Sequence, residues 1–295
     1  MQLTFDDFKC LADQAALAAT EAGALITRYR YRDVEVREKS ETAGDGLASQ
    51  VVTEVDVRSE ELILRHLAPT IERYDLAVLT EEREDDHQRL KKDYFWCIDP
   101  LDGTLPFTRD TPGYSVSIAL VRQDGRAVLG TVFDPVTRKL YRAVAGGGVQ
   151  IDGVNFQPTI RAEGRLRFFC DCTFPSHPDR ETLIHEVEAV AAYEGFSGVD
   201  VIAGAGAVFN ACQVLEDGPA CYFKKPKSKN GGGSLWDFAA TACLFEEAGL
   251  YVRDFEGRPL DLNRTESTFM NHRGVCYAST PGLAAALRGG KGIKL

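Results

Sequence analysis

The sequence predicts a protein of mixed α and β structure, in the α/β or α+β class, with two subdomains. Amphipathic helical patterns occupy the first part of the chain, and short apolar runs typical of strands follow them. In the second half, strand and helix patterns alternate as in an α/β unit. We therefore expect an α+β subdomain over residues 1–160 and an α/β subdomain over residues 161–295.

The first helix is predicted over residues 5–29. Its apolar side chains recur every three or four residues from Phe8 to Tyr29, so they share one face of a helix. Thr4, followed three residues later by Asp7, resembles a capping box, in which each residue satisfies a free amide of the first turn. This pattern indicates a helix that packs on a core along one side.

A short strand at 34–36 and a polar, glycine-containing loop at 40–46 are expected next. A second amphipathic helix is then predicted over residues 54–68. Its inner face is predicted to consist of Val55, Ser59, Leu62 and His66.

Strand patterns dominate the middle of the chain, and Asp124-Gly125 between two apolar runs is a strong hairpin signal. The predicted strands are 76–80, 94–99, 114–122, 126–133 and 138–145, followed by a break at three glycines. In the second half we expect strands at 166–171 and 198–203, and helices at 180–194, 205–216 and 236–248.

Length, charge and composition exclude several classes of protein. The chain has 295 residues, enough for a substantial core, and no apolar run approaches the roughly 18 residues of a membrane span. The acidic start, MQLTFDDFKCLADQ, does not resemble a secretion signal, so we expect a cytoplasmic protein. The net charge of −10 disfavours nucleic-acid polymers and anionic membranes as partners.

Cysteine and histidine carry no recognisable catalytic or zinc-binding pattern. The eight cysteines contain no C-x-x-C pair, and the five histidines stand in unrelated contexts. We interpret the cysteines as buried free thiols, and we expect no nucleophile-base pair among these residues.

The sharpest local feature is the segment WCIDPLDGT, residues 96–104. Asp99 ends an apolar run, where α/β proteins place their ligand sites, and Pro100 stops the strand ladder. The turn brings Asp102 back toward Asp99, and two such carboxylates repel each other unless a cation lies between them. Hard oxygen ligands suit Mg²⁺, and the glycine and Thr104 that follow offer amides and a hydroxyl to an anion.

Two other interpretations of this segment are open. It could be an ordinary acidic turn at the end of a strand. It could also be the nucleophile loop of an aspartyl-phosphate phosphatase, but there one residue separates the two aspartates, whereas here Pro100 and Leu101 both lie between them. The extra residue puts Asp102 out of register for acid-base work, so a purely metal-based mechanism is favoured.

Four blocks together resemble the inositol monophosphatase superfamily of Mg²⁺-dependent, lithium-sensitive phosphomonoesterases, which includes the 3'(2'),5'-bisphosphate nucleotidases. The blocks are VTEVD at 52–56, LTEE at 79–82, WCIDPLDGT at 96–104 and LWDFAA at 235–240. Their order and spacing are more specific than any block alone. The resemblance implies a layered α-β-α-β-α sandwich of the inositol monophosphatase and fructose-1,6-bisphosphatase type.

The resemblance also implies site roles. The side chains of Glu81, Asp99, Asp102 and Asp237 and the carbonyl of Leu101 would bind two or three Mg²⁺, most of them from the first subdomain and Asp237 from the second. Asp56 would orient Thr104, and this pair, together with Glu81, would activate a water molecule. The amides of Gly103 and Thr104 would hold the phosphate.

Three of these carboxylates have simpler interpretations. Asp56 could be a surface residue favoured by the dipole of a helix start, and Asp237 could merely cap a helix. Glu81 opens the run EEREDDH, which has the composition of a solvated loop.

The substrate prediction depends on a lysine-rich segment, KKPKSKNGGG at 224–233. Lys224 and Lys225 would suit a second phosphate better than a neutral polyol. We therefore expect a 3'(2'),5'-bisphosphate nucleotidase that converts adenosine 3',5'-bisphosphate to AMP and phosphate, with inositol-1-monophosphatase as the alternative. A catalytically silent phosphate-binding scaffold is the alternative from another class. The resemblance also suggests a homodimer.

Overall fold

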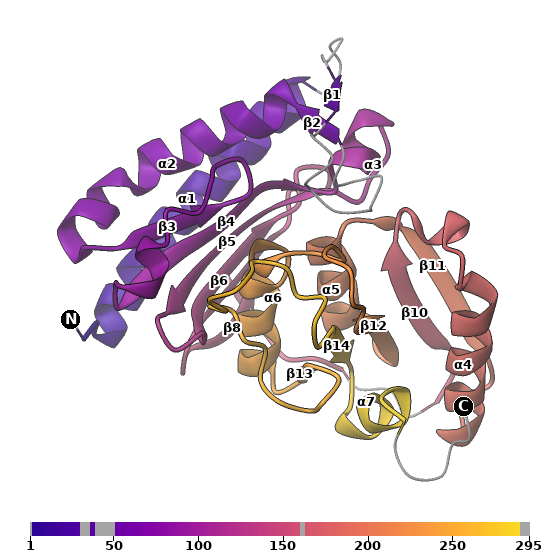
Figure 1. Cartoon of the computed structure of the whole chain (residues 1–295). Helices are drawn as coiled ribbons and strands as arrows, with labels where there is room; N and C mark the ends of the chain where they lie inside the picture. Colours follow the sequence, from indigo (N-terminus) through magenta and orange to yellow (C-terminus); the bar gives the residue numbers. More distant parts are fainter. Residues whose placement is uncertain (1, 30–35, 39–50, 160–162, 290–295) are drawn as a thin grey trace.

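The computed structural model describes residues 2–29, 36–38, 51–159 and 163–289. Two β-sheets alternate with three layers of helices, which gives the α-β-α-β-α sandwich that the resemblance predicted (Figure 1). The predicted fold class is thus confirmed. The predicted loop at 40–46 and the first two residues of the strand expected at 34–36 lie outside the described residues.

The first layer consists of α1 (Phe5–Tyr29) and α2 (Glu54–Tyr74). The predicted capping box of α1 is present: the Thr4 amide donates to Asp7 at 2.9 Å, and the Asp7 amide donates to the Thr4 hydroxyl at 3.2 Å. Helix α2 continues six residues past the predicted end at 68, through Pro69. Its buried face uses Ile63 and Leu67, so the prediction of Leu62 and His66 was wrong, and both are only partly buried.

The first sheet has seven strands in the order β3-β4-β5-β6-β7-β8-β9. Only β3 and β4 are parallel; the other neighbours are antiparallel, and β5 and β6 form the predicted hairpin. The strands are β3 (Ala77–Thr80), β4 (Tyr94–Asp102), β5 (Ser115–Arg122), β6 (Ala127–Phe133), β7 (Leu140–Val144), β8 (Gly148–Ile151) and β9 (Val154–Phe156). The last two were not predicted, because they are short and lack an apolar run.

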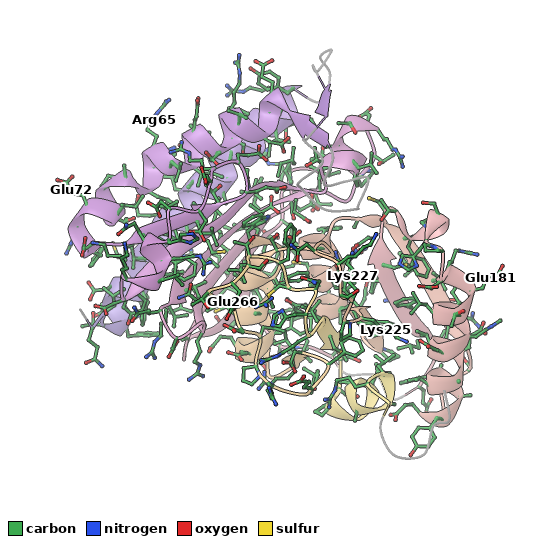
Figure 2. All side chains as sticks on the ribbon, viewed as in Figure 1. Arg65, Glu72, Glu181, Lys225, Lys227 and Glu266 are labelled. Atoms are coloured by element: carbon green, nitrogen blue, oxygen red, sulfur yellow. The ribbon has the colours of Figure 1, made fainter. Side chains whose placement is uncertain are left out.

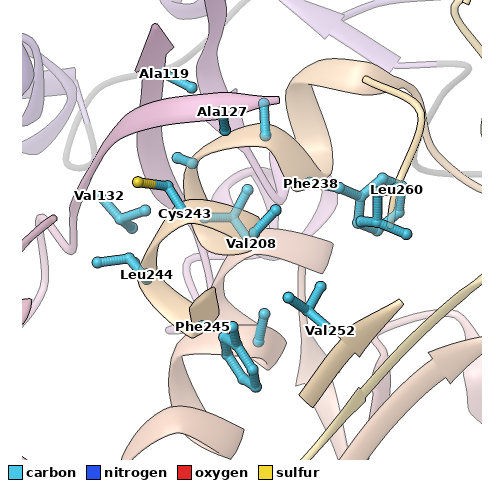
Figure 3. Packing of buried hydrophobic residues seen from close by; sticks show 14 of the residues in the cluster. Ala119, Ala127, Val132, Val208, Phe238, Cys243, Leu244, Phe245, Val252 and Leu260 are labelled. Atoms are coloured by element: carbon cyan, nitrogen blue, oxygen red, sulfur yellow. The ribbon is translucent and has the colours of Figure 1, made fainter. Parts of the chain in front are cut away.

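Two helices form the middle layer, α5 (Ala207–Glu216) and α6 (Leu235–Ala248). They cover the face of the first sheet opposite α1 and α2. Contact is close at Gly130 of β6, where an added Cβ would lie 2.2 Å from the Ala240 carbonyl of α6. Figure 3 shows part of this core, in which Leu244 of α6 and Val132 of β6 belong to the same buried cluster.

The second sheet has five strands in the order β11-β10-β12-β14-β13. Strands β10, β11 and β12 are parallel, and β14 is antiparallel to both of its neighbours. The strands are β10 (Leu166–Asp171), β11 (Val199–Ala205), β12 (Ala220–Lys224), β13 (Tyr251–Arg253) and β14 (Val275–Ala278), and the outer helices are α4 (Arg180–Tyr193) and α7 (Pro281–Leu287). Short elements were missed here too, namely β12, β13, β14 and α7.

The smaller elements complete the chain and lie outside the five layers. They are the antiparallel pair β1 (Val36–Glu38) and β2 (Val51–Thr53), the short helix α3 (Thr104–Thr108), and single 3-10 turns at Gln88–Leu90 and Phe174–Ser176. None of the described helices combines the length and the apolar character that a membrane crossing requires.

Three buried apolar clusters fill the spaces between the layers. One lies between α1, α2 and the first sheet, one holds α5 and α6 between the two sheets, and one lies under α4 and α7. The middle cluster joins both halves of the chain, since Phe95 of β4 and Tyr222 of β12 both belong to it. The division at residue 160 falls between the two sheets and stays a prediction of domain organisation.

Candidate metal and phosphate site

Strand β4 delivers two carboxylates to one side of the first sheet. Residues three apart on a regular strand point to opposite faces. Here, however, Asp99 pairs with Ser117 and Asp102 with Ser115, so three steps along β4 match two along β5, which is a β-bulge. The extra residue turns Asp102 to the side of Asp99. The Leu101 amide donates to the Asp99 carboxylate at 3.1 Å and holds this turn.

Asp237 reaches the same place from the first turn of α6. Its carboxylate accepts the Ser234 amide at 2.6 Å and so forms one half of a capping box. One oxygen from each of Asp99, Asp102 and Asp237 lies within 4.8 Å of the others. Two of these aspartates are buried and Asp237 is half-buried. The Asp237 side chain therefore both caps α6 and belongs to the acidic cluster, so its two predicted roles are compatible.

The environment of these carboxylates favours a cation. Burial, followed by the charges of Glu81 and Asp102, holds the pKa of Asp99 well above its ordinary value. Burial and Asp237 do the same to the pKa of Asp102. Burial raises the pKa of Asp237 to about 6, although Lys224 opposes the shift. A divalent ion would relieve the desolvation and repulsion of all three, so these residues fit a hard cation.

Glu81 lies next to this cluster, directly after β3. Its amide donates to the Ile98 carbonyl of β4 at 3.3 Å. Its charge contributes to the raised pKa of both Asp99 and Asp237. The structure therefore brings Glu81 to the edge of the acidic cluster, although its oxygens are not in the group within 4.8 Å.

Asp56 and Thr104 meet as the resemblance implied. Asp56 is buried in the first turn of α2, and Thr104 opens α3. The Thr104 hydroxyl lies 3.5 Å from an Asp56 oxygen and 3.2 Å from the Leu101 carbonyl, and it can donate to either acceptor. This hydroxyl thus links the proposed proton acceptor to a proposed carbonyl ligand.

Gly103 occupies a position that only glycine fits. Its φ is +83°, in the left-handed region, and an added Cβ would lie 2.6 Å from the Gly113 carbonyl. The backbone can therefore turn sharply from the bulge of β4 into α3, which places the segment next to the carboxylates.

The two predicted substrate-binding lysines diverge. The Lys224 ammonium at the end of β12 lies 2.8 Å from an Asp171 oxygen. Its charge partly opposes the rise in the pKa of Asp102 and of Asp237, so the ammonium lies close to the acidic cluster. Lys225, which is labelled in Figure 2, instead forms an ion pair with Glu186 of α4. A substrate role for Lys225 stays a prediction that this contact does not favour.

Sequence reasoning missed two parts of the site. The first amides of α5 bind the Asp102 carboxylate, with Ala207 at 2.9 Å and Val208 at 3.1 Å. Gly206 permits this, because a Cβ there would lie 2.4 Å from an Asp102 oxygen. The sequence GAG at 204–206, where a helix was predicted to begin, was the available signal. Asp171, the partner of Lys224, ends the strand predicted over residues 166–171, but nothing in the sequence indicated its pairing with Lys224.

A layered sandwich that gathers buried carboxylates from two of its layers, beside a tight glycine turn and a lysine, defines a metal-dependent phosphatase. Comparison with known proteins identifies the family: residues 7–289 match the model of the inositol monophosphatase family, and the chain belongs to it. Its members are metal-dependent phosphomonoesterases, and this chain is a phosphoric monoester hydrolase of that family.

The curated relatives include proteins with different names. The chain is 29% identical over 252 residues to Nus factor SuhB of Escherichia coli K12, covering 82% of this chain and 84% of the relative. It is 31% identical over 225 residues to the 3'(2'),5'-bisphosphate nucleotidase CysQ of Salmonella typhimurium LT2, covering 75% and 82%.

Solved structures agree on the fold. The extragenic suppressor protein SuhB of Bartonella henselae matches with a TM-score of 0.73 at 24% identity, covering 96% of this chain and all (100%) of that one. The inositol monophosphatase of Thermotoga maritima matches with a TM-score of 0.70 at 20% identity, covering 94% and 96%.

Proposed function

We propose that this protein is a Mg²⁺-dependent bisphosphate nucleotidase that hydrolyses a 3'(2'),5'-bisphosphate nucleotide, such as adenosine 3',5'-bisphosphate, to AMP and phosphate. The observation that carries the proposal is the Lys224 ammonium beside the acidic cluster. No acidic residue lies between Asp217 and Asp237, while four lysines do. A cation next to the metal ligands suits a second phosphate and offers little to a ring hydroxyl.

One curated relative supports this choice. CysQ, at 31% identity, is named as a 3'(2'),5'-bisphosphate nucleotidase. A staphylococcal inositol monophosphatase of the same fold has been solved with 2'-AMP bound, although at 20% identity it supports the fold rather than the substrate.

The carboxylates of Glu81, Asp99, Asp102 and Asp237 and the Leu101 carbonyl would hold the Mg²⁺. Bound Mg²⁺ supplies a Lewis acid for the phosphate oxygens and an activated water. With Asp56 these residues bring five negative charges to a small volume, and we propose two or three ions on that ground.

The remaining residues bind the substrate and move a proton. The amides of Gly103 and Thr104 would orient the phosphate. The Thr104 hydroxyl would take a proton from the attacking water as it passes its own proton to the Asp56 carboxylate, 3.5 Å away. Lys224 would bind the second phosphate.

Steady-state kinetics with adenosine 3',5'-bisphosphate and inositol 1-phosphate, each with Mg²⁺, test the proposal. We expect kcat/KM to favour the bisphosphate, and Lys224→Met to lower it by about tenfold or more, since a charge-assisted contact is lost. Lys227→Met, in the same segment, is the matched control and should change little. A large preference for inositol 1-phosphate, unaffected by Lys224→Met, would overturn the proposed substrate.

Inositol-1-monophosphatase is the second candidate. It is supported by the description of the family that the chain matches, the inositol monophosphatase family. The silent-scaffold alternative is set aside, because the chain belongs to a family of phosphomonoesterases and its carboxylates converge. A small phosphorylated substrate is the partner we propose; a homodimer, a cytoplasmic location and the exclusion of membranes and nucleic-acid polymers stay predictions.

A further inference from the structure

We propose that Asp171 is a positioning residue that holds the Lys224 ammonium on the substrate side of the acidic cluster and away from the metal ligands. The inference rests on the proposed function in one respect, namely that Lys224 contacts the substrate. It adds a residue outside the four sequence blocks to the determinants of substrate choice.

The topology of the second sheet places these two side chains together. Strands β10 and β12 are parallel neighbours, with Phe169 paired to Tyr222, and they end at Asp171 and Lys224. The ammonium lies 2.8 Å from the Asp171 carboxylate, and the two side chains are 19% and 31% exposed. The pair is therefore partly shielded from solvent, and the positions of its two residues are set by strand register rather than by a flexible loop.

Asp171 is itself fixed by buried donors. One of its oxygens accepts the Tyr222 hydroxyl at 2.9 Å and the Asn210 amide at 3.3 Å, while the other faces Lys224. Tyr222 and Asn210 are each 1% exposed and come from β12 and α5. Burial and the Asp171 charge raise the pKa of Tyr222, which keeps its hydroxyl a donor. Such a carboxylate is oriented before any substrate arrives.

Lys224 needs such a restraint. Asp171, Asp237 and Asp102 all stabilise its ammonium and raise its pKa against the effect of burial. Without Asp171, the nearest strong acceptors would be Asp237 and Asp102, which are proposed metal ligands. The ammonium also lies 5.7 Å from the centre of the Phe238 ring of α6, which bounds its movement on that side. Asp171 thus keeps the Lys224 ammonium where it can bind the substrate and prevents it from pairing with the carboxylates that would bind the metal.

The direction in which Asp171→Asn changes KM distinguishes a positioning role of Asp171 from a purely electrostatic effect of its charge. Asp171→Asn removes a negative charge next to an anionic substrate, so charge alone would lower KM for adenosine 3',5'-bisphosphate. A positioning role predicts that KM rises instead, because Lys224 is no longer held where it binds the substrate. We expect KM to rise by about fivefold or more, with kcat changed less than about twofold and KM for inositol 1-phosphate nearly constant.

A double-mutant cycle completes the test. In the Asp171→Asn background, Lys224→Met should raise KM for the bisphosphate less than in the wild type, because the lysine is already misplaced. Isothermal titration of Mg²⁺ into the substrate-free variants gives a readout independent of turnover: Lys224→Met should tighten Mg²⁺ binding more in the Asp171→Asn background. Asp200→Asn, which breaks an exposed ion pair between Arg165 and β11 of the same sheet, is the matched control and should leave both measurements unchanged.

The outcomes distinguish this inference from the proposed function. If Lys224→Met raises KM for the bisphosphate but Asp171→Asn lowers it, or if the two effects simply add, the positioning role is overturned while the proposed substrate stands. If Lys224→Met leaves KM unchanged, the proposed substrate contact fails, and additive Mg²⁺ affinities would overturn the positioning role as well. Equal losses of kcat for both substrates with a lower Tm would indicate a purely structural role and would also overturn it.

Discussion

Asp237 is needed for the proposed metal site but destabilises the folded protein when no metal is bound. Its pKa rises from 3.8 to about 6 on folding. Between these two values the folded protein binds more protons at Asp237 than the unfolded chain does, so the free energy of unfolding falls as pH rises through this window. An asparagine at this position does not titrate, so its contribution to the free energy of unfolding does not fall with pH. Its side-chain oxygen can still accept a hydrogen bond from the Ser234 amide.

We therefore expect Asp237→Asn to lower kcat/KM by at least about a hundredfold, because a lost metal ligand costs more than a lost supporting contact. In chelator at pH 7.5 the same variant should be more stable than the wild type by up to about 3 kcal/mol, and the difference should vanish near pH 4. Enzyme assays and thermal melts across pH measure the two effects.

Two controls sharpen this prediction. Glu72→Gln removes one charge from an exposed position on α2 and should leave both activity and the pH dependence of Tm unchanged (Figure 2). Added Mg²⁺ should raise the Tm of the wild type more than that of Asp237→Asn. An Asp237→Asn protein that retains turnover would refute the ligand role.

At the level of single residues, sequence reasoning performed best where an apolar run ends in a polar side chain. Asp99 follows such a run, and its place at a buried strand end could be predicted. Asp171 also ends a predicted strand, but its partner is set by the pairing of β10 with β12. Local sequence carries no record of that pairing, and β12 itself was not predicted.

At the level of elements, two helices approach the first sheet so closely that small residues are required. Gly23 of α1 faces the Phe133 ring, and Gly130 of β6 faces the α6 backbone. The contact at Gly130 matters for the site as well, because α6 carries Asp237 in its first turn.

Gly130→Ala should destabilise the protein by about 1 to 3 kcal/mol or more, since the backbone of α6 must move to admit the methyl group. Gly282→Ala is the matched control: it lies in α7, where the nearest atom to an added Cβ is 3.5 Å away. That substitution should be neutral or slightly stabilising. Chemical denaturation compares the two, and equal stabilities would show that α6 does not constrain the sheet as described.

The elements that could be predicted are long and strongly patterned. Helix α1, strands β5 and β6 and helix α6 lie within one or two residues of their predicted ranges. Helix α2 extends past its predicted end at residue 68 and contains Pro69, a residue that usually ends a helix. The five-residue β12 and seven-residue α7 are too short to show a period.

At the level of the whole molecule, the two sheets share one core. The face of the first sheet that carries Phe95, Cys97 and Val121 is covered by α5 and α6, which follow residue 160 in the chain. Residues 1–160 therefore include the first sheet but not helices α5 and α6, which bury one of its faces. This arrangement joins the two subdomains more strongly than a linker would.

Residues 1–160 expressed alone should consequently fail to form a stable monomer. We expect aggregation or the absence of a cooperative thermal transition by circular dichroism, because a large apolar face is left exposed. Co-expression with residues 161–295 should restore soluble, active protein. A cooperative melt of the isolated fragment would show instead that the N-terminal subdomain folds independently.

Asp102 has a consequence for how this family is to be classified. Its carboxylate belongs to the acidic cluster and also caps α5 through the amides of Ala207 and Val208. A descendant of this chain that lost catalysis would still uncap a buried helix if it replaced Asp102. Retention of this aspartate in a related sequence is therefore not, by itself, evidence that the relative is an enzyme.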